Sequence, residues 1–347
     1  MSDEEAQSSP AQPVDPPADK PKPKRRGPVR KKKPSPDGEN PQSRNQKTDT
    51  QSRSASGKQD ADQKENKHNP PTKERRASKS DRKLKFMDDQ ARNVRDLSAL
   101  KGKRPIVALT AYDAVMGRLV CDAGVDFILV GDSVGTTLLG HKTTIPVDMT
   151  DMVRHTAAVR RAQPNCLLVA DLPFGEASFS FDRLLESARR LVQEGGADAV
   201  KIEGGRDVAD DIEKLVATGI PVLGHIGLLP QTVKAIGGYR KFGGERQEAE
   251  DLYTDAIALE EAGCFAVIAE MMEENVAKEL ARQILPPLIG IGSGAGCDGQ
   301  ILVTTDLLGY NLGKAPSFVK TYTNLNQVIS KALSQYVSEV REGKFPT

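Results

Sequence analysis

The segment CLLVADLPFGEASFSFDRLLESARRLVQEGGADAVKIE, residues 166–203, decides the fold. It opens with an apolar run, Cys166–Asp171, and closes with a second one, Ala199–Glu203. Both runs are almost continuously apolar, which is typical of strands in a parallel sheet that is covered on both faces. Between them, Phe181–Glu194 has apolar residues three and four positions apart, the spacing of an amphipathic helix. The segment therefore predicts a strand, a helix and a second, parallel strand.

The same alternation of short apolar runs and helical periods continues from about residue 83 onward. We expect eight strands, which are Ile106–Thr110, Phe127–Gly131, Cys166–Asp171, Ala199–Glu203, Val222–His225, Ala266–Glu270, Leu288–Gly292 and Ile301–Thr304. Eight βα units over about 260 residues match a (β/α)8 TIM barrel in number and length. A doubly wound parallel sheet is the structural alternative.

Three further segments have helical spacing. Glu245–Ala262 is expected to be a helix between two strands, and Val94–Leu100 a short helix that covers the barrel bottom. A final apolar stripe extends from Leu325 to Val340. We expect it to pack outside the barrel or at a subunit contact.

The first part of the chain has a different composition. Residues 1–82 contain no Leu, Ile, Phe, Tyr or Trp but hold 12 of the 22 prolines. Such a mixture cannot bury enough apolar surface to offset the entropy lost on ordering. Residues 1–86 carry 22 Lys and Arg against 13 Asp and Glu, and the rest of the chain carries 27 against 35. We therefore expect a disordered Lys/Pro-rich tail over residues 1–86 and a catalytic TIM barrel over residues 87–347.

The basic run Lys22–Lys33 could contact nucleic acid or an acidic membrane surface, because dense cations gain by releasing counterions from phosphates. A solvated, solubilising arm is the simpler interpretation. The opening residues MSDEEAQ fit neither a secretory signal nor a mitochondrial transit peptide, and no stretch of about 18 apolar residues could span a membrane. The four cysteines show no CxxC spacing, so we expect reduced thiols in a cytoplasmic protein.

Polar residues follow or end five consecutive predicted strands. In a TIM barrel the carboxyl ends of the strands meet at one mouth, where catalytic groups gather. Left dry and unpaired, these groups would cost several kcal/mol. They are Asp132 and Ser133 after the second strand, Asp171 on the third, Lys201 and Glu203 on the fourth, His225 on the fifth and Glu270 on the sixth.

Three of these side chains predict a metal site. Asp132, Asp171 and Glu203 are like charges that repel one another unless a cation lies between them. Oxygen ligands without Cys or paired His favour Mg²⁺ over Zn²⁺. Each carboxylate alone could instead cap a helix or form a surface ion pair. Lys201 could form a structural salt bridge, and His225 could satisfy a hydrogen bond in the core.

The glycine-rich loop GIGSGAGCDGQ, Gly290–Gln300, is a weak match to a dinucleotide-binding fingerprint. It follows the seventh strand and lacks an acidic partner about 20 residues on. Tight backbone turns beside a ligand explain its glycines better. Asp113 follows the first strand, and we assign it no catalytic role, because a helix N-cap explains it equally well.

Seven sequence blocks resemble the ketopantoate hydroxymethyltransferase (3-methyl-2-oxobutanoate hydroxymethyltransferase) family. They occur in family order over essentially all of Leu100–Pro346. The blocks are LTAYD (Leu109–Asp113), VGDSVG (Val130–Gly135), PNCLLVADLPFG (Pro164–Gly175), VKIEGG (Val200–Gly205), PVLGHIGLLPQ (Pro221–Gln231), GGY (Gly237–Tyr239) and GIGSGAGCDGQILV (Gly290–Val303).

The resemblance implies a transferase of pantothenate biosynthesis. Its members move a hydroxymethyl group from 5,10-methylenetetrahydrofolate to 3-methyl-2-oxobutanoate and form 2-dehydropantoate through a Mg²⁺-stabilised enolate. It also implies a symmetric homo-oligomer, often a decamer. Two alternatives remain open. One is a related Mg²⁺-dependent carbon–carbon lyase of the isocitrate lyase or phosphoenolpyruvate mutase type, and the other is a binding protein whose basic tail contacts nucleic acid.

The resemblance also implies roles for the polar residues at the strand ends. Asp132 and Asp171 would bind Mg²⁺ directly, and Glu203 would complete the metal site. The oxo acid would be bound by Asp132, Ser133, Asp171, Lys201 and His225, the last beside the new hydroxymethyl group. Glu270 would be the general base, which is the chemistry that an unpaired carboxylate at the mouth can perform.

Overall fold

The structure is a computed structural model that describes residues 90–347, and the basic tail predicted over residues 1–86 lies outside the described residues. The strands are β1 (Ile106–Thr110), β2 (Phe127–Val130), β3 (Leu167–Asp171), β4 (Ala199–Glu203), β5 (Val222–Gly227), β6 (Ala266–Glu270), β7 (Leu288–Ile291) and β8 (Gly299–Leu302). They form one closed barrel in sequence order, in which every neighbouring pair is parallel and β8 pairs with β1. The predicted (β/α)8 barrel is confirmed.

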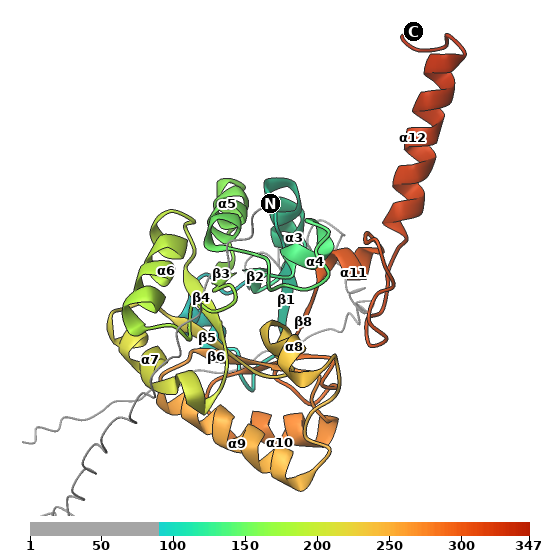
Figure 1. Cartoon of the computed structure of the whole chain (residues 1–347). Helices are drawn as coiled ribbons and strands as arrows, with labels where there is room; N and C mark the ends of the chain where they lie inside the picture. The colour runs from blue at the N-terminus through green and yellow to red at the C-terminus, as the bar shows by residue number, and fades with distance from the viewer. Residues whose placement is uncertain (1–89) are drawn as a thin grey trace, which may run out of the picture. The chain divides into compact units, whose positions relative to one another are not determined.

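Helices alternate with the strands and cover the barrel, whereas the last helix, α12, extends away from it (Figure 1). They are α2 (Val94–Ser98), α3 (Ala114–Asp122), α4 (Val134–Thr137), α5 (Met149–Arg161), α6 (Phe181–Gln193), α7 (Arg206–Ala217), the 3₁₀ turn η1 (Pro230–Thr232), α8 (Val233–Ile236), α9 (Arg246–Glu261), α10 (Glu274–Gln283), α11 (Thr304–Leu308) and α12 (Leu325–Arg341). None of the helices within residues 90–347 is both long and apolar enough to cross a bilayer.

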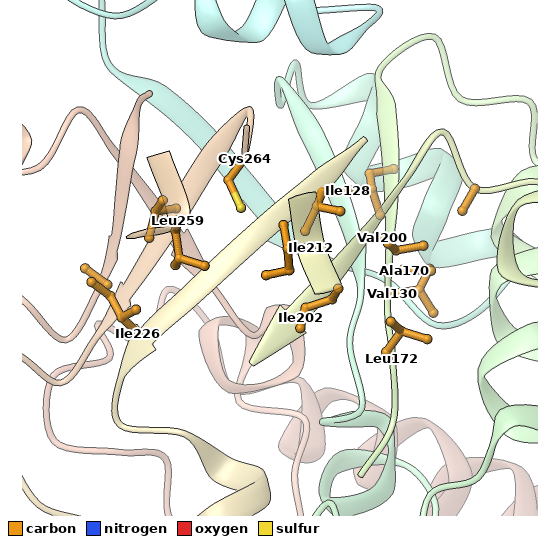
Figure 2. Packing of buried hydrophobic residues seen from close by; sticks show 14 of the residues in the cluster. Ile128, Val130, Ala170, Leu172, Val200, Ile202, Ile212, Ile226, Leu259 and Cys264 are labelled. Atoms are coloured by element: carbon orange, nitrogen blue, oxygen red, sulfur yellow. The ribbon is translucent and has the colours of Figure 1, made fainter. Parts of the chain in front are cut away.

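Strands β2 to β7 bury both of their faces, whereas β1 exposes Val107 and β8 exposes Gln300. On β3, Leu168 and Ala170 face outward and pack under the surrounding helices, whereas Leu167 and Val169 belong to the layer inside the barrel. Figure 2 shows part of the outer layer, where Ile202 of β4 lies with Ile212 of α7. This double burial is the reason why the strands read as continuous apolar runs.

The eighth strand begins two residues earlier than the sequence suggested. The prediction was Ile301–Thr304, but β8 is Gly299–Leu302 because its ladder with β1 starts at Gly299 opposite Ile106. A side chain at Gly299 would come within 2.5 Å of the Ile106 carbonyl, so the glycine allows this close pairing. Thr304 instead starts α11, and its hydroxyl donates to the Thr110 carbonyl.

The helices expected from spacing are confirmed to within a turn. Asp113 is the N-cap of α3, since its side chain accepts a hydrogen bond from the Met116 N–H at 2.8 Å. The short helix α2 buries Leu97 completely against the layer inside the barrel, as expected of a cover for its bottom. All four cysteines are free thiols, and three of them are buried.

Candidate active site

Strand alternation directs the polar residues at the mouth of the barrel inward. On β3 and β4 the inward residues are Leu167, Val169 and Ala199, and side chains two residues apart on a strand share a face. The same face therefore carries Asp171, Lys201 and Glu203. Register aligns them further, because Asp171 lies beside Lys201 and Glu203 lies beside His225 across the ladders.

Asp132 and Ser133 reach the mouth by a turn. β2 ends at Val130, and the Asp132 N–H donates to Asp171 Oδ2 at 3.0 Å. Gly131 makes this approach possible, because a Cβ there would lie 2.8 Å from Ser133 Oγ. Ser133 precedes α4, and its hydroxyl is hydrogen bonded to the Tyr112 hydroxyl at 2.8 Å.

One cavity of about 100 Å³ contains all the polar residues expected at the mouth. The seven predicted site residues all line it, and the remaining wall is mostly apolar, with two threonines, Thr110 and Thr144. The seven are Asp132, Ser133, Asp171, Lys201, Glu203, His225 and Glu270. A cavity of this size suits a small organic acid, whereas drug-sized ligands need roughly 300–1,000 Å³.

The ammonium group of Lys201 lies among the carboxylates. Its Nζ is 2.7 Å from Asp171 Oδ1 and 3.7 Å from Glu203 Oε1, and all three side chains are almost fully buried. Burial would lower the pKa of Lys201, but Asp171, Glu203 and Asp132 outweigh it and raise the pKa. Lys201 therefore stays charged and partly neutralises the cluster.

The positive charge of Lys201 is too small to allow all three carboxyl groups, Asp132, Asp171 and Glu203, to ionise easily. Burial, followed by repulsion from Asp171 and Glu203, raises the pKa of Asp132 to about 8. Burial also raises the pKa of Asp171, against the opposing effect of Lys201. Burial would raise the pKa of Glu203 as well, but His225 and Lys201 together lower it. The cavity thus has a deficit of positive charge.

His225 lies between two acids. Its Nδ1 is 3.6 Å from Glu203 Oε1, and its Nε2 is 3.3 Å from Glu270 Oε2. Burial and Lys201 would lower the pKa of His225, but the two glutamates outweigh them and raise it. Glu270 is the more exposed of these acids, with 16% of its side chain accessible against 3% for Glu203. Glu270 is therefore the carboxylate best placed to meet an entering substrate.

The oxygen donors fit a hard divalent cation, but they do not form a ready cage. Asp132, Asp171 and Glu203 supply carboxylate oxygens only, as Mg²⁺ prefers. Within residues 90–347 no group of three His, Cys, Asp or Glu side chains is arranged around one ion position. The Lys201 ammonium lies between Asp171 and Glu203 instead. The chemistry of the donors therefore fits the ion, although their present arrangement does not surround one position.

Gln231 belongs to the site although its sequence position did not single it out. Its side-chain Nε2 donates to Asp132 Oδ2 at 3.0 Å and to the Leu172 carbonyl at 2.9 Å. Its main-chain N–H donates to Glu203 Oε2 at 3.1 Å. One residue of η1 thereby ties the ends of β2, β3 and β4 together. Gln231 lies six residues after the predicted strand Val222–His225 and ends the block PVLGHIGLLPQ, but neither signal assigns its side chain to the cavity.

The glycine-rich loop provides turns beside the cavity. Gly292 and Gly294 have φ values of +65° and +80°, which side chains rarely adopt. Ile291, directly before them, lines the cavity. The expectation of tight turns beside the site is confirmed for these two glycines.

Comparison with known proteins gives a consistent family. A sequence model of the ketopantoate hydroxymethyltransferase family matches residues 91–347. Three similar proteins are each named 3-methyl-2-oxobutanoate hydroxymethyltransferase. The one from Halalkalibacterium halodurans is 49% identical over 244 residues, covering 70% of this chain and 88% of its own length. Those from Thermotoga maritima and Thermus thermophilus are 49% and 48% identical over 255 residues, covering 74% of this chain and 94% and 97% of their own lengths.

Solved structures resemble the chain more distantly. Phosphoenolpyruvate phosphomutase from Streptomyces platensis subsp. rosaceus has a TM-score of 0.49 and 15% identity, over 72% of this chain and 88% of that one. A 2,3-dimethylmalate lyase has a TM-score of 0.47 and 15% identity, over 72% and 84%. These values are too low to inform function. The family match over the whole barrel and the relatives near 50% identity show that the chain belongs to the ketopantoate hydroxymethyltransferase family.

Proposed function

We propose that the chain transfers a hydroxymethyl group from 5,10-methylenetetrahydrofolate to 3-methyl-2-oxobutanoate and forms 2-dehydropantoate. The observation that carries the proposal is the single cavity lined by Lys201, the carboxylates and the His225–Glu270 pair. Membership of the family supports the same reaction. The balance of atoms requires one water, which supplies the hydroxyl oxygen, and tetrahydrofolate leaves.

The size of the cavity supports different places for the two substrates. About 100 Å³ accommodates the five-carbon oxo acid but is far too small for the folate. The folate therefore lies across the mouth, with only its one-carbon end reaching into the cavity. The oxo acid binds beneath it, against Lys201 and Ser133.

Lys201 and Glu270 carry the proton transfer in this proposal. Glu270 accepts the proton from C3 of the oxo acid, as a general base within a partly dry site. The charged Lys201 stabilises the negative charge that develops on the oxo oxygen. The electron pair left at C3 then forms the new bond to the one-carbon unit. His225, 3.3 Å from Glu270, lies where the new hydroxyl group arises.

Asp132, Asp171 and Glu203 are the residues that would hold Mg²⁺. The ion would supply positive charge to the oxo and carboxylate oxygens of the substrate. The charge deficit of the cavity supports this assignment, since burial and mutual repulsion raise the pKa of Asp132 to about 8.

Substituting either of two carboxylates should weaken metal binding before it affects the fold. Asp132→Asn and Asp171→Asn each remove one carboxyl group that can ionise against the cation, and we expect about a tenfold or greater loss of Mg²⁺ affinity. Titration calorimetry with Mg²⁺ alone measures it directly. Asp207→Asn, on the exposed start of α7, is the matched control and should bind like the parent. Unchanged Mg²⁺ titrations in both site variants would contradict the ligand assignment.

A turnover assay distinguishes the proposal from a lyase. Purified full-length chain with Mg²⁺, 3-methyl-2-oxobutanoate and 5,10-methylenetetrahydrofolate should form 2-dehydropantoate. The same preparation should leave isocitrate intact. Cleavage of isocitrate without hydroxymethyl transfer would replace the proposal with the lyase alternative.

We propose that the enzyme is a homo-oligomer in which a second copy of the chain covers α12. No residue of this 17-residue helix is buried among the described residues. Its apolar stripe is open, with Val328 59%, Leu333 60% and Tyr336 53% exposed. A continuous apolar stripe of this kind is typical of an interaction surface.

A cytoplasmic location, argued from the sequence alone, stays part of this proposal.

Charges placed on the α12 stripe should lower the oligomeric mass. We expect Leu333→Glu combined with Val337→Glu to yield a smaller species in light scattering coupled to size exclusion, because burying the two carboxylates in an apolar contact is costly. Gln335→Glu adds charge on the opposite side of the same helix and should leave the mass unchanged. An unaltered mass in the double variant would exclude the stripe as the contact.

A further inference from the structure

A threonine on the cavity wall has a hydroxyl group without a protein partner. Thr144 is only 4% exposed, and its Oγ1 makes no hydrogen bond with the described part of the chain. The residue lines the same cavity as Ser133 and Lys201. A buried hydroxyl left unsatisfied costs free energy, so it is retained where a ligand or water completes it.

The backbone, not the hydroxyl, holds Thr144 in place. Its carbonyl accepts a hydrogen bond from the Val147 N–H at 3.0 Å, which closes a turn in the connection between β2 and α5. That turn lies directly against α4, since a Cβ on Gly135 would come within 2.6 Å of Val147 Cγ2. The His141 N–H also donates to the Gly135 carbonyl at 2.8 Å. The loop therefore fixes Thr144 on the cavity wall through main-chain contacts, in which its hydroxyl takes no part.

The other polar groups of the cavity show what kind of ligand is missing. Four acids line the cavity and only accept hydrogen bonds when ionised; they are Asp132, Asp171, Glu203 and Glu270. The carboxylate of a ligand can therefore bind only where hydrogen-bond donors lie together. Lys201 and His225 are donors that already face these acids, so the remaining donors on the cavity wall are the hydroxyl groups of Ser133 and Thr144, in the connection between β2 and α5, and of Thr110 on β1.

Ser133 belongs to the same donor group. Its hydroxyl forms a hydrogen bond with the Tyr112 hydroxyl. Burial raises the pKa of Tyr112 to about 12, so the phenol stays protonated and can donate. When Tyr112 donates, the proton of Ser133 is available to a ligand. The connection between β2 and α5 can thus present two hydroxyl donors, from Ser133 and Thr144, to one anionic group.

We propose that Thr144 is a substrate-binding residue whose Oγ1 donates a hydrogen bond to the carboxylate of the 2-oxo acid, on the same wall as Ser133. The inference rests on the proposed function and deepens it, because it assigns the acid's carboxylate to the connection between β2 and α5. The C3 end of the acid then points toward Glu270.

The isosteric variant Thr144→Val tests the proposal. It removes the hydroxyl and keeps the shape of the side chain. We expect the Kd and KM for 3-methyl-2-oxobutanoate to rise about tenfold, as for a lost hydrogen bond to a charged group, while kcat stays within about twofold. The Tm without substrate should not fall, because an unsatisfied buried hydroxyl has been removed. Thr144→Ser should restore the affinity.

Thr305→Val is the matched control. Thr305 is also a buried threonine, 3% exposed, whose Oγ1 has no partner among residues 90–347, but it does not line the cavity. Its substitution should likewise leave the Tm no lower, and it should leave the affinity for the oxo acid unchanged.

The outcomes separate the inference from the proposed function. Titration of the parent protein with the oxo acid in the presence of Mg²⁺ comes first, and a parent that does not bind the acid overturns the proposed function. A parent that binds and a Thr144→Val variant that binds equally well overturn the role of Thr144 alone. A variant that loses affinity and Tm together shows a structural role for the hydroxyl and also overturns it.

Discussion

Replacing Glu270 with glutamine should lower turnover by about 100- to 10,000-fold, the usual contribution of a positioned general base. Glutamine keeps the shape of the side chain but cannot accept the C3 proton of the oxo acid. The affinities for Mg²⁺ and for 3-methyl-2-oxobutanoate should change little, because Glu270 is the more exposed acid beside His225 and is not one of the carboxylates that pair with Lys201. The loss should therefore appear in kcat.

Exchange of the C3 proton in deuterated water isolates the step that Glu270 performs. The parent protein with Mg²⁺ should exchange this proton even without the folate, and Glu270→Gln should not. Glu273→Gln is a matched control, since Glu273 lies three residues further on, outside the cavity, and pairs with Lys241. Exchange that persists at the parent rate in Glu270→Gln would exclude this residue as the base.

Replacing Lys201 with methionine should be the most destabilising single change in the site. The ammonium is 2.7 Å from Asp171 and almost fully buried, so its removal leaves carboxylates without their cation. Breaking a buried pair by removing one partner costs about 3–5 kcal/mol of unfolding free energy. Turnover should also fall strongly, because the ammonium group that stabilises the negative charge developing on the oxo oxygen is gone.

The stability of Lys201→Met should depend on pH in a defined direction. Burial and repulsion already raise the pKa of Asp132 to about 8 and raise that of Asp171, and Lys201 opposes both shifts. Without Lys201 both pKa values rise further. A carboxyl group with a raised pKa in the folded state stabilises the fold at low pH and loses this contribution as pH rises through that pKa. The deficit should therefore be smaller at about pH 6 than at about pH 9.

Urea unfolding without divalent ions, at both pH values, measures this deficit. Lys278→Met is the control, because Lys278 is an exposed residue of α10 and its loss should change stability little at either pH. A deficit that is the same at both pH values, or larger at low pH, would show that Lys201 does not neutralise the carboxylates.

Much of the site followed from the strands themselves. Once Ala199–Glu203 is identified as a strand, the two-residue repeat puts Lys201 and Glu203 on one face, and the barrel topology puts that face inside. Asp171, His225 and Glu270 follow by the same rule on their own strands. Residues on a predicted strand could be assigned to the cavity because local geometry fixes their direction.

Residues outside the strands could not be assigned in this way. Gln231 contacts Asp132 and Glu203 only because η1 folds back over the strand ends, and Thr144 reaches the cavity through a turn in a long connection. Neither segment has a period that predicts its direction. The predicted start of β8 was wrong for a similar reason, because the pairing of β8 with β1 joins residues that are far apart in the chain.

The sequence by itself determined the barrel, the strands that carry the chemistry and the face on which Lys201, Glu203 and Glu270 lie, because side-chain direction along a strand is a local property. The tertiary structure alone decided that Asp132 turns toward Asp171 after β2 ends, that Gln231 donates to Asp132, and that Thr144 lines the cavity with a hydroxyl that has no partner among residues 90–347. Those contacts join distant segments, and their positions depend on how the whole barrel closes.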